Sequence, residues 1–203
     1  MLTPRECLSW SSMDLLERNV EKWKETYFEN KKRGINRGEA FGKAMANGLE
    51  NDEETGDAVL DLVISQIPKF ELMDIAFTAE IKDKAGNIPV LAKPDTYKAD
   101  YSAFKEYKTS QSAWTQKKVD TFGQITFYAT VCFLKTGKIP HDIELVHVLT
   151  EKEDPERLES KIRATGEIKR YYTHRKMSDI LNMMVRMKKA WRLIEKICEE
   201  ELI

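Results

Sequence analysis

Two short groups of residues near the middle of the chain have the composition of a hydrolytic metal site. Pro94-Asp95 precedes Glu106-Tyr107-Lys108, and residues 96–105 separate the two groups. On a β-strand, side chains two residues apart point to the same face, so Glu106 and Lys108 project together while Tyr107 points into the core. If Asp95 ends the neighbouring strand on that face, two carboxylates and an ammonium group converge. Paired carboxylates bind Mg²⁺, and a lysine beside them completes the groups needed for phosphodiester hydrolysis.

Each group in such a site has its own task. The metal polarises the phosphate and lowers the pKa of a bound water, while Lys108 orients that water or stabilises the developing charge. Replacing Lys108 with methionine is therefore expected to impair the chemistry more than metal binding. The competing interpretation is a solvated strand face, because charged residues make up 33% of the chain and such a triplet arises easily by chance.

The surrounding sequence predicts a mixed α/β domain. Helical spacing of apolar residues predicts helices over 13–28, 36–50, 58–67, 115–136 and 177–201, the first capped by a serine. Strand formers between turn signals predict a hairpin of 70–82 with 88–92, and further strands over 103–109, 143–149 and 161–174. This order implies one domain over residues 1–203, with a central mixed β-sheet flanked by helices, N-terminal helices and a long C-terminal helix.

The composition limits the environment and the partners. Thirty-three Lys and Arg against 34 Asp and Glu give a net charge of −1, so a polyanion must be held by a local patch. The three cysteines lack CxxC spacing, which argues against disulfides and favours the cytoplasm. No stretch approaches the roughly 18–20 apolar residues of a membrane span, so no membrane partner is expected.

Four segments carry a resemblance to a known family. They are Leu8-Ser9-Trp10-Ser11-Ser12, Phe41-Gly42-Lys43-Ala44-Met45-Ala46-Asn47-Gly48-Leu49-Glu50, Pro94-Asp95 with Glu106-Tyr107-Lys108, and Gln124-Ile125-Thr126-Phe127-Tyr128. In this order they resemble the opening serine motif, the second-helix motif, the signature and the QxxxY helix of the PD-(D/E)XK nuclease superfamily. The similar branch contains RecB-type, Cas4-like and phage lambda-type exonucleases. The resemblance implies a restriction-endonuclease-like core and DNA hydrolysis with Mg²⁺ or Mn²⁺.

The resemblance also implies roles for the matched residues. Asp95 and Glu106 would be metal ligands, the carbonyl of Tyr107 a third ligand, and Lys108 the catalytic lysine. The cysteines that hold an iron–sulfur cluster in many Cas4-like relatives are missing, so no iron–sulfur cluster is expected.

Gln124 and Tyr128 lie at i,i+4 on one face of the predicted helix. The resemblance implies that they line the cleft and orient the active site or the DNA. The alternative interpretation is an ordinary polar helix residue and a core tyrosine.

The chain departs from the family pattern at Ala46, where the branch has a metal-binding His or Glu. Glu50, one helical turn further on, and Glu39, about two turns back, are candidates for the missing carboxylate. Glu50 is preferred because the family motif also tends to carry an acid there. The alternative for Glu50 is a solvated acid in an acidic run.

Polar, aromatic and basic residues that follow the predicted catalytic strand favour contacts with DNA. They offer hydroxyls, an aromatic platform and cations where a nucleic-acid strand would leave the metal. The residues are Thr109, Ser110, Ser112, Trp114, Lys117 and Lys118. The alternative for any one of them is a solvated helix end.

The sequence therefore predicts a Mg²⁺-dependent deoxyribonuclease, an exonuclease acting in recombination, repair or phage DNA processing. Two alternatives stay open: a nuclease-fold DNA-binding protein with impaired catalysis, which Ala46 favours, and an adaptor that acts through its C-terminal helix. The chain is short for a standalone member of the family, which leaves a helicase or annealing-protein partner open. A homo-oligomer is also open, because some relatives form rings.

Overall fold

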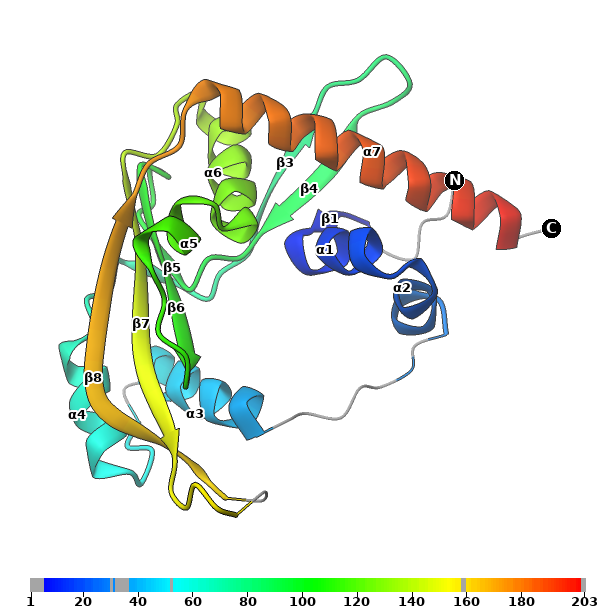
Figure 1. The fold of residues 1–203 in the computed structure, drawn as a ribbon. Helices are drawn as coiled ribbons and strands as arrows, with labels where there is room; N and C mark the ends of the chain where they lie inside the picture. The colour runs from blue at the N-terminus through cyan, green and yellow to red at the C-terminus, as the bar shows by residue number, and fades with distance from the viewer. Residues whose placement is uncertain (1–5, 30, 32–36, 52, 158–159, 202–203) are drawn as a thin grey trace.

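The computed structural model describes residues 6–29, 31, 37–51, 53–157 and 160–201 (Figure 1). Its mixed α and β composition confirms the predicted fold class. The helices are α1 (Trp10–Arg18), α2 (Val20–Tyr27), α3 (Arg37–Asn51), α4 (Ala58–Gln66), α5 (Gln116–Asp120), α6 (Gly123–Thr136) and α7 (Met177–Glu201). The strands are β1 (Leu8–Ser9), β2 (Leu72–Met73), β3 (Phe77–Ile81), β4 (Ile88–Ala92), β5 (Thr96–Tyr97), β6 (Ala103–Ser110), β7 (Asp142–Lys152) and β8 (Ile162–Thr173).

The strands form two sheets where the sequence predicted one. The larger sheet has the order β2-β5-β6-β7-β8, and the smaller has the order β1-β4-β3. The predicted hairpin is the antiparallel pair of β3 and β4. Pro94, which has no N–H to donate to a ladder, lies between β4 and β5, where the chain passes from one sheet to the other.

Two helices predicted as continuous are interrupted in the structure. Asn19 separates α1 from α2, and its side chain caps α2 by accepting a hydrogen bond from the N–H of Lys22 at 2.9 Å. Thr121 and Phe122 separate α5 from α6. The predicted serine cap of the first helix is Ser9, whose hydroxyl accepts from the N–H of Ser12.

Strand β6 lies between two hydrophobic cores. On one face, Phe104 belongs to the core that contains α6 and α7, and its ring meets Tyr128 of α6 edge-on at 6.0 Å. On the other face, Tyr107 packs with Met45 and Leu49 of α3 in a second core that also contains α4. The residues of β6 are therefore held from both sides.

The second face of β6 also carries a buried ion pair. Nζ of Lys105 lies 2.5 Å from Oε2 of Glu144 on β7, with side-chain exposures of 6% and 0%. Arg170 on β8 binds the same carboxylate, its Nη2 donating to Oε2 at 3.0 Å. Because burial alone would raise the pKa of Glu144, its lowered pKa reflects these two cations.

The segment containing Trp10 anchors the start of α6. A Cβ atom built on Gly123 would lie 2.3 Å from the indole of Trp10, so only glycine admits this close approach. The Trp10 ring also meets Phe127 at 6.2 Å, and Ser12 accepts a hydrogen bond from the indole N–H of Trp23 at 2.9 Å. These contacts fix the helix that presents Gln124 and Tyr128.

A Gly123→Ala substitution is expected to destabilise the protein by about 1–3 kcal/mol, because a packed indole must move. Urea denaturation measures this change. Gly42→Ala, in the interior of α3, is the matched control, since its Cβ would meet nothing nearer than Oγ1 of Thr109 at 3.6 Å, which is an ordinary contact. Equal unfolding free energies for the two variants would contradict this account of Trp10.

Candidate active site

The pairing of β5 with β6 brings Asp95 and Glu106 to one side of the larger sheet. Thr96 lies opposite Lys105 in this antiparallel pair. One residue further along the same register, Asp95 lies opposite Glu106, and directly opposed residues of antiparallel strands share a face. Oδ2 of Asp95 accepts a hydrogen bond from the main-chain N–H of Tyr107 at 2.5 Å, which holds the carboxylate against β6.

Lys108 completes the group of charges. Its Nζ lies 2.5 Å from Oε1 of Glu106, as expected for residues two apart on a strand. The Glu106 side chain is only 3% exposed. Its second oxygen, Oε2, finds no hydrogen-bond partner among the described residues. Glu106 is therefore a buried acid with one oxygen in an ion pair and the other unpartnered.

The electrostatics of the site are dominated by burial and by the facing carboxylates. Burial, and then the charge of Glu106, raise the pKa of Asp95 to about 8, although Lys108 opposes the shift. Burial also raises the pKa of Glu106 against the effect of Lys108. Burial alone would lower the pKa of Lys108, but the two carboxylates raise it. The single ammonium group thus stays charged and compensates only part of the negative charge.

Gln124 and Tyr128 face this group from α6. Nε2 of Gln124 donates to the hydroxyl of Tyr128 at 2.9 Å. The Gln124 side chain also lies beside Glu106 and lowers the pKa of that carboxyl. The pKa of Tyr128 is raised by burial and by the charges of Glu106 and Asp95. The two residues therefore border the carboxylates rather than an apolar core alone.

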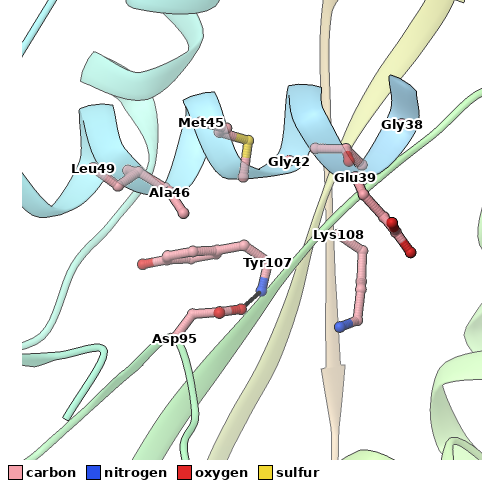
Figure 2. A pocket seen from close by; sticks show the side chains of 10 residues that line it. Gly38, Glu39, Gly42, Met45, Ala46, Leu49, Asp95, Tyr107 and Lys108 are labelled. Carbon is pink, nitrogen blue, oxygen red and sulfur yellow. Dashed lines mark hydrogen bonds between the residues drawn. The ribbon is translucent and has the colours of Figure 1, made fainter. Parts of the chain in front are cut away.

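A cleft of about 400 Å³ lies between α3 and β6 (Figure 2). Asp95 and Lys108 line it from below α3 in this view, and the small residues Gly42 and Ala46 line it from the helix. Glu39 contributes a carboxylate at the same end of the cleft as Lys108. The other lining residues are Gly38, Met45, Leu49, Tyr107 and Thr109.

Ala46 lines the cleft but has no group that could bind a metal. The acids to consider near this position are Glu50 and Asp74. Glu50 is exposed and does not line the cleft, but burial and the charge of Asp74 raise its pKa, and Asp95 adds to the effect. Asp74 is a residue that the sequence did not single out. Its N–H donates to the carbonyl of Asp95 at 3.0 Å, and Nζ of Lys93 lies 2.5 Å from its Oδ2. The only sequence signal for Asp74 is an acid at the end of an apolar pair.

The expectation that Trp114 offers an exposed stacking platform is wrong. Its side chain is buried in the core, where the ring meets Phe122 at 4.9 Å. Nζ of Lys118 lies 3.9 Å from the ring centroid and covers one face. The platform is lost because this segment packs against β8: α5 contacts that strand, and the Tyr171 hydroxyl donates to the carbonyl of Trp114 at 2.6 Å.

The other residues predicted to contact DNA differ in accessibility. Thr109 lines the cleft, and Ser112 and Lys117 are exposed. Ser110 is engaged within the chain, because its hydroxyl donates to the carbonyl of Ser112 at 2.7 Å and lies 2.9 Å from Nε2 of His147. Thr109, Ser112 and Lys117 are thus the members of this set that a ligand can reach directly, together with the ammonium of Lys118.

Comparisons with protein-family models and with curated proteins give no match to this chain. Among solved structures, the chain is similar to one described as "Crystal structure of SSO0001", with a TM-score of 0.48 and 11% sequence identity. That match covers 93% of this chain and 78% of the other. No helix within the described residues has the length and apolar character needed to cross a membrane.

The metal-free protein is expected to lose stability as the pH rises from about 4 to 8. The pKa of Asp95 is raised from 3.8 to about 8 on folding, so over this range the folded state binds a proton that the unfolded state releases. Asp95→Asn removes the contribution of Asp95 to this dependence and is expected to be more stable than the wild type by about 1–3 kcal/mol at pH 8. Urea unfolding in EDTA at several pH values measures the effect.

Asp100→Asn is the control for this experiment. Hydrogen bonds from Ser102 lower the pKa of Asp100, so the same substitution there is not expected to stabilise the protein. A wild type whose stability does not fall with pH, together with no gain in Asp95→Asn, would contradict the repulsion inferred at Asp95.

Proposed function

We propose that this protein is a divalent-cation-dependent deoxyribonuclease that hydrolyses phosphodiester bonds. The observation that carries the proposal is the convergence of Asp95, Glu106 and Lys108 from neighbouring strands beside a cleft, with one buried carboxylate oxygen unpartnered among the described residues. The resemblance of the sequence to the PD-(D/E)XK nucleases points to the same chemistry.

A Mg²⁺ or Mn²⁺ ion fits this set of donors. Asp95, Glu106 and the carbonyl of Tyr107 would hold it. Within the described part of the chain, no three His, Cys, Asp or Glu side chains converge as a ready metal group. Mg²⁺ nevertheless commonly binds through one or two carboxylates and keeps several waters. When bound, the cation would supply Lewis-acid activation of the phosphate and of water.

The chain's own residues account for the remaining steps. Lys108, held 2.5 Å from Glu106 and lining the cleft, donates hydrogen bonds to the phosphate and stabilises the charge that develops on it. Gln124 and Tyr128 border Glu106 from α6, and the Gln124 side chain lies beside its carboxylate. The small side chains of Gly42 and Ala46 leave room for a nucleic-acid backbone under α3.

The finer assignment is an exonuclease of recombination, repair or phage DNA processing, which the sequence resemblance supports. A cytoplasmic location accompanies it, supported by Cys7, Cys132 and Cys198, which are free thiols. The second candidate is a DNA-binding or adaptor protein with impaired catalysis. It is favoured by Ala46, which places a methyl group in the cleft where the resemblance implies a metal ligand.

Incubation with linear and circular DNA tests the proposal. Degradation of linear DNA is expected with Mg²⁺ and is abolished by EDTA, and protection of circular DNA identifies an exonuclease. Asp95→Ala is expected to lose at least about 10²-fold in rate, because it removes a ligand. Lys108→Met is expected to lose about 10²–10³-fold while retaining Mn²⁺ binding.

Lys84→Met, in an exposed turn outside the site, is the control and is expected to keep full activity. Unchanged degradation by both Asp95→Ala and Lys108→Met would refute the site. DNA binding by the wild type without any metal-dependent cleavage would favour the second candidate.

A further inference from the structure

Three carboxylates form one row across neighbouring strands of the larger sheet. Met73 of β2 lies opposite Thr96 of β5, and Thr96 lies opposite Lys105 of β6. The next residue in each segment is an acid: Asp74, Asp95 and Glu106 in turn. The hydrogen bond from the N–H of Asp74 to the carbonyl of Asp95 at 3.0 Å continues this register beyond the end of β2.

The three acids are neighbours in the sheet. Asp95 lies opposite Glu106 in the register of β5 and β6, and the main-chain hydrogen bond from Asp74 ties the third acid to Asp95. Within this row, Lys93 and Lys108 supply the opposing ammonium groups, one at each end.

A second, independent feature indicates that a positively charged ligand binds beside these acids. Oε2 of Glu106 is buried and has no hydrogen-bond partner among the described residues. Buried polar atoms are nearly always partnered, so an orphaned carboxylate oxygen points to a donor or cation that the described residues do not provide. This oxygen belongs to Glu106 at the β6 end of the row, the residue that lies opposite Asp95.

We infer that Asp74 supplies a third carboxylate to the divalent-cation site and replaces the ligand that the second-helix position lacks at Ala46. The inference rests on the proposed function, because it concerns the same cation. Asp74 suits this role better than Glu50, because Asp74 continues the row of the sheet, whereas Glu50 is exposed on α3 and lies beside Asp74.

The side chain of Asp74 must turn to reach the cation. Its Oδ2 is paired with Lys93, but the two side chains are 39% and 46% exposed, and an ion pair so open to water is easily exchanged. Lys93 therefore competes with the cation for Asp74. The acids of the described residues do not form a closed metal group as they stand, so the inference requires this rotation.

Calorimetric titration with Mn²⁺ tests the inference on the full chain and reads binding rather than activity. The variants are Asp74→Asn, Asp95→Asn, Glu50→Gln and, as a control, Glu80→Gln, an exposed acid of the smaller sheet. Asp74 has a φ of +49°, and asparagine accepts this left-handed conformation, so Asp74→Asn keeps the fold and the N–H bond to Asp95.

Asp74→Asn and Asp95→Asn are each expected to weaken Mn²⁺ binding at least about tenfold, because even residues that act through a ligand change metal affinity about 10- to 100-fold. Glu80→Gln is expected to bind as the wild type does. Full affinity in Asp74→Asn with a loss in Asp95→Asn would overturn the role of Asp74 and leave the proposed function standing. A loss in Glu50→Gln but not in Asp74→Asn would assign the third carboxylate to α3 and also overturn it. No Mn²⁺ binding by the wild type, or full affinity in Asp95→Asn, would overturn both.

Discussion

Burial of the two facing carboxylates of Asp95 and Glu106 is the constraint on which the site depends. The antiparallel register of β5 and β6 fixes both groups on one face, and α6 shields Glu106 from water, so the charges can neither separate nor be fully solvated. One lysine, Lys108, offsets part of this charge. The two hydrophobic cores on either side of β6 supply the stability that holds so unfavourable an arrangement in place.

The predictable part of this arrangement is the part that depends on local periodicity. Glu106 and Lys108 share a face and Tyr107 lies on the opposite one because alternation along a strand is independent of tertiary context. Gln124 and Tyr128 meet because i,i+4 spacing alone brings them together on a helix. The long C-terminal helix likewise follows from its own apolar pattern and has the predicted bounds.

Features that depend on distant partners were not accessible from the sequence. Asp74 joins the row of acids through β2 and β5, which have two residues each and are too short to show any alternation. Burial of Trp114 depends on α5 packing against β8, a contact between segments far apart in the chain. The division into two sheets depends on where the chain turns at Pro94, and proline marks such a turn without giving its direction.

The ion pair of Lys105 with Glu144 has a consequence for how the protein folds. Strand β6 carries charged residues on both faces, with Lys105, which pairs with Glu144 of β7, on one and Glu106 and Lys108 on the other. Slipping β6 by one residue against β7 would send every one of its side chains to the wrong side. Glu144 would then lose Lys105 inside an apolar layer, and Glu106 and Lys108 would move together to the opposite face, a penalty that a purely aliphatic strand would not incur. The charged residues of β6 therefore favour a single register of β6 against β7 while the sheet assembles.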